Sequence, residues 1–156
     1  MPNTCTGRIE ATADAQLLLP DLNVLITAHR SDSPLHARCR DWLRAAYTGD
    51  EAFGICPPVL IGLARILTHA RVFRPPDTHD QAFAFVRSLV GHPNALLLNP
   101  GREHLGLFED LCRRADAHGD LVTDAYLAAL AIETGAVLVS ADRDFARFPG
   151  LRWREP

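Results

Sequence analysis

The residues best suited to chemistry are aspartates that follow short apolar stretches of the chain. Asp21 comes just after the apolar residues 17–19, and Asp142 and Asp144 come just after residues 136–139. Buried strands of parallel sheets are continuous apolar runs of this kind, and ligands bind beyond the ends of such strands. We therefore expect these three aspartates to meet at one edge of a sheet.

Two further aspartates precede a long apolar segment. Asp124 lies at the start of a helix that is predicted over residues 122–134 and ended by Gly135, and Asp120 lies one helical turn earlier. Aspartate is also a favoured helix-cap and turn residue, so each of these positions taken alone is more often structural. The joint placement of the acidic residues is what indicates a functional site.

Carboxylates gathered in one place raise one another's pKa unless a cation lies among them. Such a set of oxygen ligands suits Mg²⁺ or Mn²⁺, which also bind phosphate oxygens. The ion can polarise a phosphodiester and activate a water molecule for in-line attack. Neither a Ser–His–Asp order nor the setting of a reactive cysteine competes with this chemistry in the sequence.

Alternating strands and helices are predicted to position these residues. The strands are expected over residues 17–19, 52–56, 95–98, 136–139 and 151–153. The helices are expected to begin at Pro34, at Pro57 and after Thr78, and to cover residues 102–118 and 122–134. This alternation predicts an α/β fold, a three-layer α/β/α sandwich with a mostly parallel central sheet.

Apolar spacing predicts which residues of two helices face the core. In the helix after Thr78, which is expected to be the N-cap, the buried residues would be Ala82, Phe83, Val86 and Val90. In the helix over residues 102–118 they would be Leu105, Phe108 and Cys112.

The basic residues exclude several classes of enzyme, because all sixteen of them are arginines. Without lysine, the P-loop phosphate grip and Schiff-base chemistry are excluded. A haloacid-dehalogenase-like phosphatase is also set aside, since it needs a lysine and a second aspartate where this chain has Asn23. The net charge of −3 argues against a polybasic nucleic-acid binder, but not against an enzyme that contacts a short stretch of RNA.

The length and composition are those of one cytoplasmic domain. Residues 1–16 are polar and predicted to be a flexible tail, and residues 17–156 are predicted to form a single domain. The four cysteines lack metal-ligand spacing and are expected to be free thiols in a reducing compartment. We recognise no signal peptide and no apolar run of about 20 residues, so no membrane association is expected.

Four segments resemble PIN domains, and in particular the VapC-type toxins of type II toxin–antitoxin systems. Residues 21–25 (DLNVL) look like the opening D-x-N-h-L motif of these domains. Residues 119–131 (GDLVTDAYLAALA) and 138–145 (LVSADRDF) are similar to the later acidic blocks, and residues 145–153 (FARFPGLRW) to the tail of the toxins. The acidic motifs are specific when they are taken together and in order.

The resemblance implies a Mg²⁺- or Mn²⁺-dependent endoribonuclease that works as a homodimer and is silenced by a VapB-like antitoxin, whose tail enters the site. Carried over by position, the catalytic residues would be Asp21, Asp124, Asp142 and Asp144, and the first three would bind the metal. Ser140 would orient the site. Asn23 would brace Asp21 through side-chain hydrogen bonds.

One position departs from the family pattern. Many members have a glutamate three residues before an arginine on the helix after the second strand; here the arginine is Arg65, and Gly62 takes the place of the glutamate. Either the aspartates suffice, with Asp120 as a substitute, or the protein is a catalytically degenerate PIN domain that binds RNA or an antitoxin. We favour retained activity and expect Gly62→Glu to leave the rate similar or to raise it. Arg65 would bind an RNA phosphate or an antitoxin carboxylate, or else form a structural ion pair.

Overall fold

A single five-stranded sheet lies at the centre of the computed structural model, which describes residues 16–156. The predicted tail therefore lies, apart from Gln16, outside the described residues. The sheet order is β3-β2-β1-β4-β5, and every neighbouring pair is parallel. The strands are β1 (Leu18–Pro20), β2 (Phe53–Ile55), β3 (Ala95–Leu97), β4 (Val137–Val139) and β5 (Trp153–Arg154). The predicted parallel sheet is thus confirmed.

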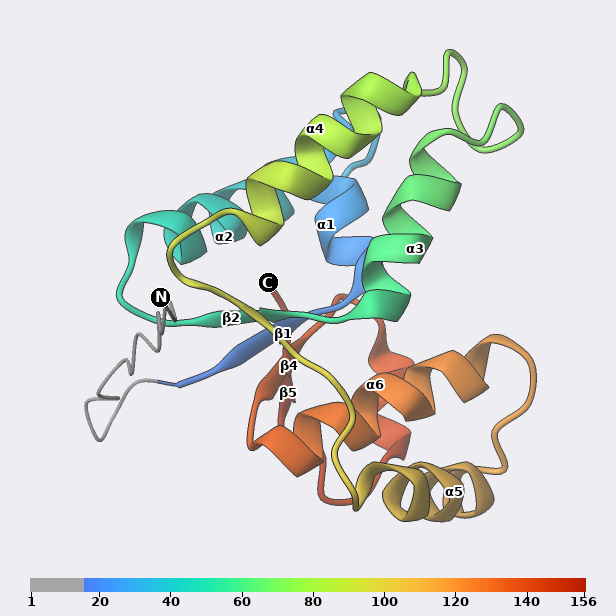
Figure 1. The fold of residues 1–156 in the computed structure, drawn as a ribbon. Helices are drawn as coiled ribbons and strands as arrows, with labels where there is room; N and C mark the ends of the chain where they lie inside the picture. The colour runs from blue at the N-terminus through green and yellow to red at the C-terminus, as the bar shows by residue number, and fades with distance from the viewer. Residues whose placement is uncertain (1–15) are drawn as a thin grey trace, which may run out of the picture.

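Helices cover both faces of this sheet (Figure 1). One face carries α1 (Leu22–His29), α2 (His36–Thr48), α3 (Pro57–Leu67) and α4 (His79–Val90). The other face carries α5 (His104–Ala115) and α6 (Asp120–Thr134), and a short 3₁₀ helix, η1 (Arg143–Arg147), follows β4. The three-layer α/β/α sandwich is therefore confirmed.

The middle strand, β1, is where the strand order reverses. From β1 the chain moves outward to β2 and β3, and it later returns to the other side of β1 to form β4 and β5. In sheets of this kind, ligands bind beyond the carboxyl ends of the strands at the point of reversal. Pro20 at the end of β1 pairs with Val139 at the end of β4. Asp21 and Ser140, the next residues, therefore leave the sheet at the same edge.

In the N-terminal half of the chain, two helices differ from the prediction. Residues 22–29 form α1, which was not predicted as a helix. This helix is only eight residues long, and half of them are buried (Val24, Leu25, Ile26 and Ala28), so its sequence shows little amphipathic period. The next helix, α2, begins at His36 rather than at Pro34. The residues before it form a turn in which the Leu35 N–H donates to the Ser33 hydroxyl over 3.2 Å.

The predicted buried faces of α4 and α5 are partly wrong. Thr78 caps α4 as predicted, and Gln81 completes a capping box with it. However, Phe83 and Val90 are 45% and 44% exposed, and Leu105 is 71% exposed. The fully covered leucines are instead Leu89 in α4 and Leu111 in α5. Each of these outer helices buries only a narrow stripe, and several apolar residues flank it.

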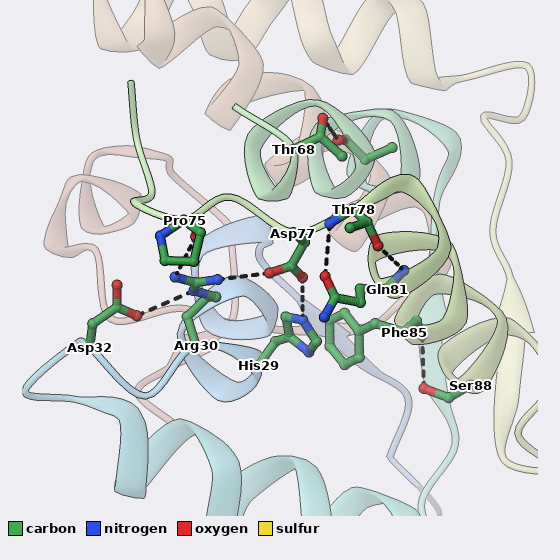
Figure 2. A network of polar contacts seen from close by, with 11 residues as sticks. His29, Arg30, Asp32, Thr68, Pro75, Asp77, Thr78, Gln81, Phe85 and Ser88 are labelled. Atoms are coloured by element: carbon green, nitrogen blue, oxygen red, sulfur yellow. Dashed lines mark hydrogen bonds and ion pairs between the residues drawn. The ribbon is translucent and has the colours of Figure 1, made fainter. Parts of the chain in front are cut away.

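A polar cluster fastens the C-terminal end of α1 to the segment before α4 (Figure 2). The Asp77 carboxylate lies 2.6 Å from His29 Nε2, and it accepts a hydrogen bond of 2.7 Å from Arg30 Nη1. The rings of His29 and Phe85 stack with centroids 4.3 Å apart, and the Arg30 guanidinium lies 4.3 Å from the centroid of the Phe73 ring. We call these five residues the Asp77 cluster. It fixes the far end of the helix that begins beside Asp21.

Two further predictions concern cysteines and membranes. Cys39 and Cys56 are buried free thiols, and Cys112 is a half-buried free thiol; Cys5 lies outside the described residues. Within residues 16–156, no helix has both the length and the apolar character needed to cross a bilayer.

Candidate functional site

A cavity of about 480 Å³ opens at the edge of the sheet where β1 and β4 end. Its acidic lining residues are Asp21, Asp120, Asp124 and Asp142. The structure thus brings together three of the four aspartates that the resemblance implies to be catalytic, and it adds the suggested substitute, Asp120. These side chains come from the end of β1, the start of α6 and the turn after β4. The expected convergence at one sheet edge is confirmed for Asp21, Asp124 and Asp142.

Ser140 fixes the deepest of these carboxylates. Asp21 is only 4% exposed, and its Oδ2 accepts a hydrogen bond of 2.9 Å from the Ser140 hydroxyl. The same hydroxyl oxygen accepts the Asp142 N–H over 3.0 Å. The Asp21 N–H donates to the Val139 carbonyl over 2.9 Å, as a continuation of the β1–β4 pairing. One hydroxyl therefore joins the end of β1 to the turn after β4.

Asn23 does not brace Asp21 as we expected. Its side chain is exposed and lines the cavity, and it takes part in none of the hydrogen bonds found among residues 16–156. Asp21 is the N-cap of α1, so Asn23 lies in the first turn of the helix. From there its amide remains free to meet a ligand in the cavity, while Ser140 orients Asp21.

The fourth predicted aspartate, Asp144, lies beside the cavity and is not part of its lining. Asp142 caps η1, and its Oδ1 accepts the Asp144 N–H over 2.8 Å. The Asp144 side chain itself is exposed. Its charge nevertheless helps to raise the pKa of Asp124, so it is part of the electrostatic environment of the site.

The electrostatics of the site are those of acidic groups held close together. Burial is the main reason why the pKa of Asp124 is raised to about 7. The charges of four other aspartates add to this pKa shift: Asp21, Asp142, Asp144 and Asp120. Burial also raises the pKa of Asp21; the hydrogen bond from Ser140 opposes this shift, and the charge of Asp142 adds to it. A cation in the cavity would offset the repulsion at both residues.

The donor set fits a hard divalent cation. All four titratable acids around the cavity are aspartates, and no histidine or cysteine of residues 16–156 lines it. Oxygen-only ligands favour Mg²⁺ or Mn²⁺ over softer metals. In the described part of the chain, no three such side chains are already gathered closely enough to enclose an ion. The aspartates would therefore have to draw together around an ion that enters the open cavity.

The opposite wall of the cavity comes from α3. Pro58, Val59 and Ile66 line it, and Gly62 lies on the same helix face, one turn from each of them. A Cβ atom at Gly62 would lie only 2.6 Å from Leu22 Cδ2. Leu22 therefore occupies the space that a side chain at position 62 would need. Leu22 Cδ2 is the end of a flexible side chain, so Leu22 must shift to admit a larger residue at position 62, and our expectation for the rate of Gly62→Glu stays a prediction.

Arg65 is the one basic side chain of residues 16–156 that lines the cavity. It is exposed and forms none of the ion pairs found in this part of the chain. By contrast, arginines near the C-terminus have intramolecular partners: Arg147 donates to the Ala115 carbonyl over 2.9 Å, and Arg154 lies 3.7 Å from Glu51. The free guanidinium of Arg65 thus faces the acidic residues across an open space.

Sequence reasoning missed six residues of the cavity lining: Leu22, Pro58, Val59, Ile66, Thr123 and Leu127. Of these, Leu22 and Thr123 adjoin the predicted aspartates Asp21 and Asp124. Their position next to Asp21 and Asp124 in the sequence could have indicated Leu22 and Thr123. However, the sequence does not show which residues beside an aspartate point into the same cavity.

Comparison with known proteins confirms the resemblance. Residues 18–151 match the PIN domain family. Ribonuclease VapC31 of Mycobacterium tuberculosis is 42% identical over 140 residues, which are 90% of this chain and 99% of that protein. VapC ribonuclease Mb2897 of Mycobacterium bovis is 43% identical over 140 residues, covering 90% of this chain and 95% of that protein.

A solved structure supports the fold. The crystal structure of VapBC2 from Rickettsia felis, bound to a DNA fragment from its promoter, contains a chain that superposes with a TM-score of 0.68 at 14% identity. The superposition covers 90% of this chain and 98% of the other. The family match spans residues 18–151, which are most of the chain and include every residue that lines the acidic cavity, so this chain belongs to the PIN domain family.

Proposed function

We propose that this protein is an endoribonuclease toxin of the VapC type, and that it uses Mg²⁺ or Mn²⁺ held by Asp21, Asp124 and Asp142. The observation that carries the proposal is the set of four aspartates around one cavity, where the pKa of Asp124 is raised to about 7. Relatives that align with 90% of the chain are named ribonucleases, which supports the same activity.

The proposed role of each site residue follows from its position in or beside the cavity. When bound, the ion would polarise the phosphodiester and activate water for attack. The hydrogen bond from Ser140 orients the Asp21 carboxylate. The hydrogen bond that Asp142 accepts as the N-cap of η1 orients the Asp142 carboxylate. Asp124 would lose its proton as the ion binds, and Asp144 would add negative charge at the margin of the cavity. Arg65 on the opposite wall would bind a phosphate of the RNA.

The same cavity would also receive the inhibitor. We propose a VapB-like antitoxin whose tail enters the cavity and pairs with Arg65 or with the aspartates. We also propose a homodimer that acts in the cytoplasm, where its RNA lies. Expression in bacteria should arrest growth, and co-expression of the neighbouring upstream gene should relieve the arrest. Light scattering would test the dimer; a lone monomer at working concentrations would contradict it.

The degenerate alternative is favoured by one observation, which is that α3 supplies no carboxylate to the cavity. An RNA-cleavage assay with purified protein separates the two functions. The nuclease should cut single-stranded or looped RNA with Mn²⁺ present and stop when EDTA is added. Cleavage that survives EDTA would contradict the metal mechanism. Binding of RNA without cleavage under any metal condition would establish the degenerate alternative.

A further inference from the structure

The hydroxyl of Thr123 is not used within the fold. Three threonines at the C-terminal ends of helices donate to the carbonyl four residues earlier: Thr48, Thr68 and Thr134, over 2.9, 2.7 and 2.7 Å. The side chain of Thr123, in the first turn of α6, takes part in none of the side-chain hydrogen bonds found among residues 16–156. Its hydroxyl is therefore available to a ligand.

Thr123 lies where its hydroxyl can contact a ligand bound in the cavity. Thr123 is exposed and lines the acidic cavity between Asp120 and Asp124. α6 and α3 lie on opposite faces of the sheet (Figure 1). Residues of both helices line the cavity, which therefore has an α6 wall and an α3 wall. On the α6 wall every other polar side chain in the lining is a carboxylate, which accepts hydrogen bonds when ionised. Once Asp124 has lost its proton, Thr123 is the hydrogen-bond donor among these side chains.

A phosphodiester bound between the two walls would need donors on both sides. Arg65 supplies them from α3, while the carboxylates of α6 would repel the phosphate wherever no cation screens them. A hydroxyl one residue from Asp124 can donate to a phosphate oxygen that lies next to that carboxylate. This contact would fix the position of the RNA backbone on the side where charge alone would push it away.

We infer that Thr123 is a substrate-positioning residue, which donates its hydroxyl to a phosphate oxygen of the bound RNA opposite Arg65. The inference rests on the proposed function, because it names the contact that this site makes with its substrate. It predicts that the hydroxyl acts on RNA binding and leaves metal binding unchanged.

The test replaces the hydroxyl by a methyl group of nearly the same size. Thr123→Val should raise KM for RNA about tenfold, the value expected for one hydrogen bond to a charged group. kcat and the Mn²⁺ concentration for half-maximal rate should stay within about twofold. Thr123→Ser should restore KM. Thr48→Val is the matched control, since the Thr48 hydroxyl is exposed and donates within its own helix.

A second measurement does not depend on cleavage. In an Asp21→Asn background with EDTA, adding Thr123→Val should weaken RNA binding by about the same factor as it raises KM. An unchanged KM and an unchanged affinity would overturn the inference, and so would a lower kcat with a shifted Mn²⁺ requirement. If the wild-type protein binds RNA but cuts none, the proposed function fails while the binding comparison still decides the role of Thr123.

Discussion

The buried carboxylate of Asp77 and the carboxylates of the acidic cavity have opposite electrostatic environments. Asp77 has a side chain that is 8% exposed, and it meets two basic partners, His29 at 2.6 Å and Arg30 at 2.7 Å. Asp21 and Asp124 meet mainly other aspartates, and burial together with these charges raises the pKa of both. The charge of Asp77 is balanced within the protein, whereas the charges of Asp21 and Asp124 are not, and the cation that we propose would balance them.

We therefore expect Asp77 to contribute to the stability of the fold and the cavity aspartates to contribute to function. A carboxylate with internal partners contributes to the folded state, and removing it leaves those partners unsatisfied. Carboxylates that repel one another cost stability, and such groups cluster at functional sites. The predictions below follow from this difference.

The largest effect is expected from Asp21→Asn. It keeps the size of the side chain and the Ser140 hydrogen bond, but it removes a charge that the ion needs. The cleavage rate should fall by about 100-fold or more. The metal-free variant should be at least as stable to urea as the wild type, because one repulsive charge is gone. Asp41→Asn, at an exposed position in α2, is the control and should change neither property. A marked loss of stability would mean that Asp21 is structural.

The next effect is expected from Asp77→Asn, with the opposite pattern. It removes the charge that His29 and Arg30 share, so the free energy of unfolding should fall by about 2 kcal/mol. The cleavage rate per folded molecule should stay within about twofold, because the Asp77 cluster lies away from the cavity. Urea denaturation and the RNA assay, run side by side, measure both quantities. A loss of cleavage rate as large as that of Asp21→Asn would contradict the purely structural role that we assign to Asp77.

The pH dependence should also distinguish the acidic cavity. Asp124 has a pKa of about 7 in the folded protein, above its ordinary value of 3.8. Between these values the folded state binds more protons than the unfolded state, so the stability of the metal-free protein should fall as pH rises from about 4 to 7. Urea midpoints measured in EDTA would show this fall in the wild type and a weaker one in Asp124→Asn. Identical curves would contradict the pKa shift. Mn²⁺ binding near pH 6 should release a proton.

The smallest effect is expected at the α3 wall. Gly62→Ala gains about 1 kcal/mol in helix propensity, but its Cβ would meet Leu22 Cδ2 at 2.6 Å. We expect these to offset each other and leave a change in stability below about 1 kcal/mol. Combined with Leu22→Ala, the same substitution should become stabilising relative to Leu22→Ala alone, with a coupling of at least about 0.5 kcal/mol. Strict additivity would show that Leu22 and position 62 do not compete for space.

The sequence was informative where local pattern decides the structure. Asp21 and Asp142 could be assigned to one sheet edge because each follows a short apolar run, and parallel strands place their carboxyl ends together. Asp124 could be added because the apolar period of residues 122–134 and Gly135 at their end predict a helix, although α6 begins earlier, at Asp120. These inferences need no knowledge of how the helices pack.

Contacts between distant segments could not be predicted in this way. His29 and Asp77 are 48 residues apart, and nothing in either segment indicates the other. The competition between Leu22 and Gly62 depends on how α1 packs on α3. The motif that contains Asn23 did not show that its side-chain amide is free, because the side-chain hydrogen bond to Asp21 comes from Ser140, in another part of the chain. Phe83 and Leu105 were misplaced since an outer helix buries only one stripe.

The hydrogen bond between Ser140 and Asp21 joins residues that are 119 positions apart in the chain. Contacts of such long range form late, because the intervening segments must first be brought into order. A polypeptide that is still being made has β1, β2 and β3 long before β4 can insert beside β1. Fragments that stop before β4 carry Asp21 and Asp124 but lack the turn that holds Ser140 and Asp142. Assembly of the acidic cavity therefore requires a chain translated at least through Asp142, and we expect translation products that stop before β4 to lack cleavage activity.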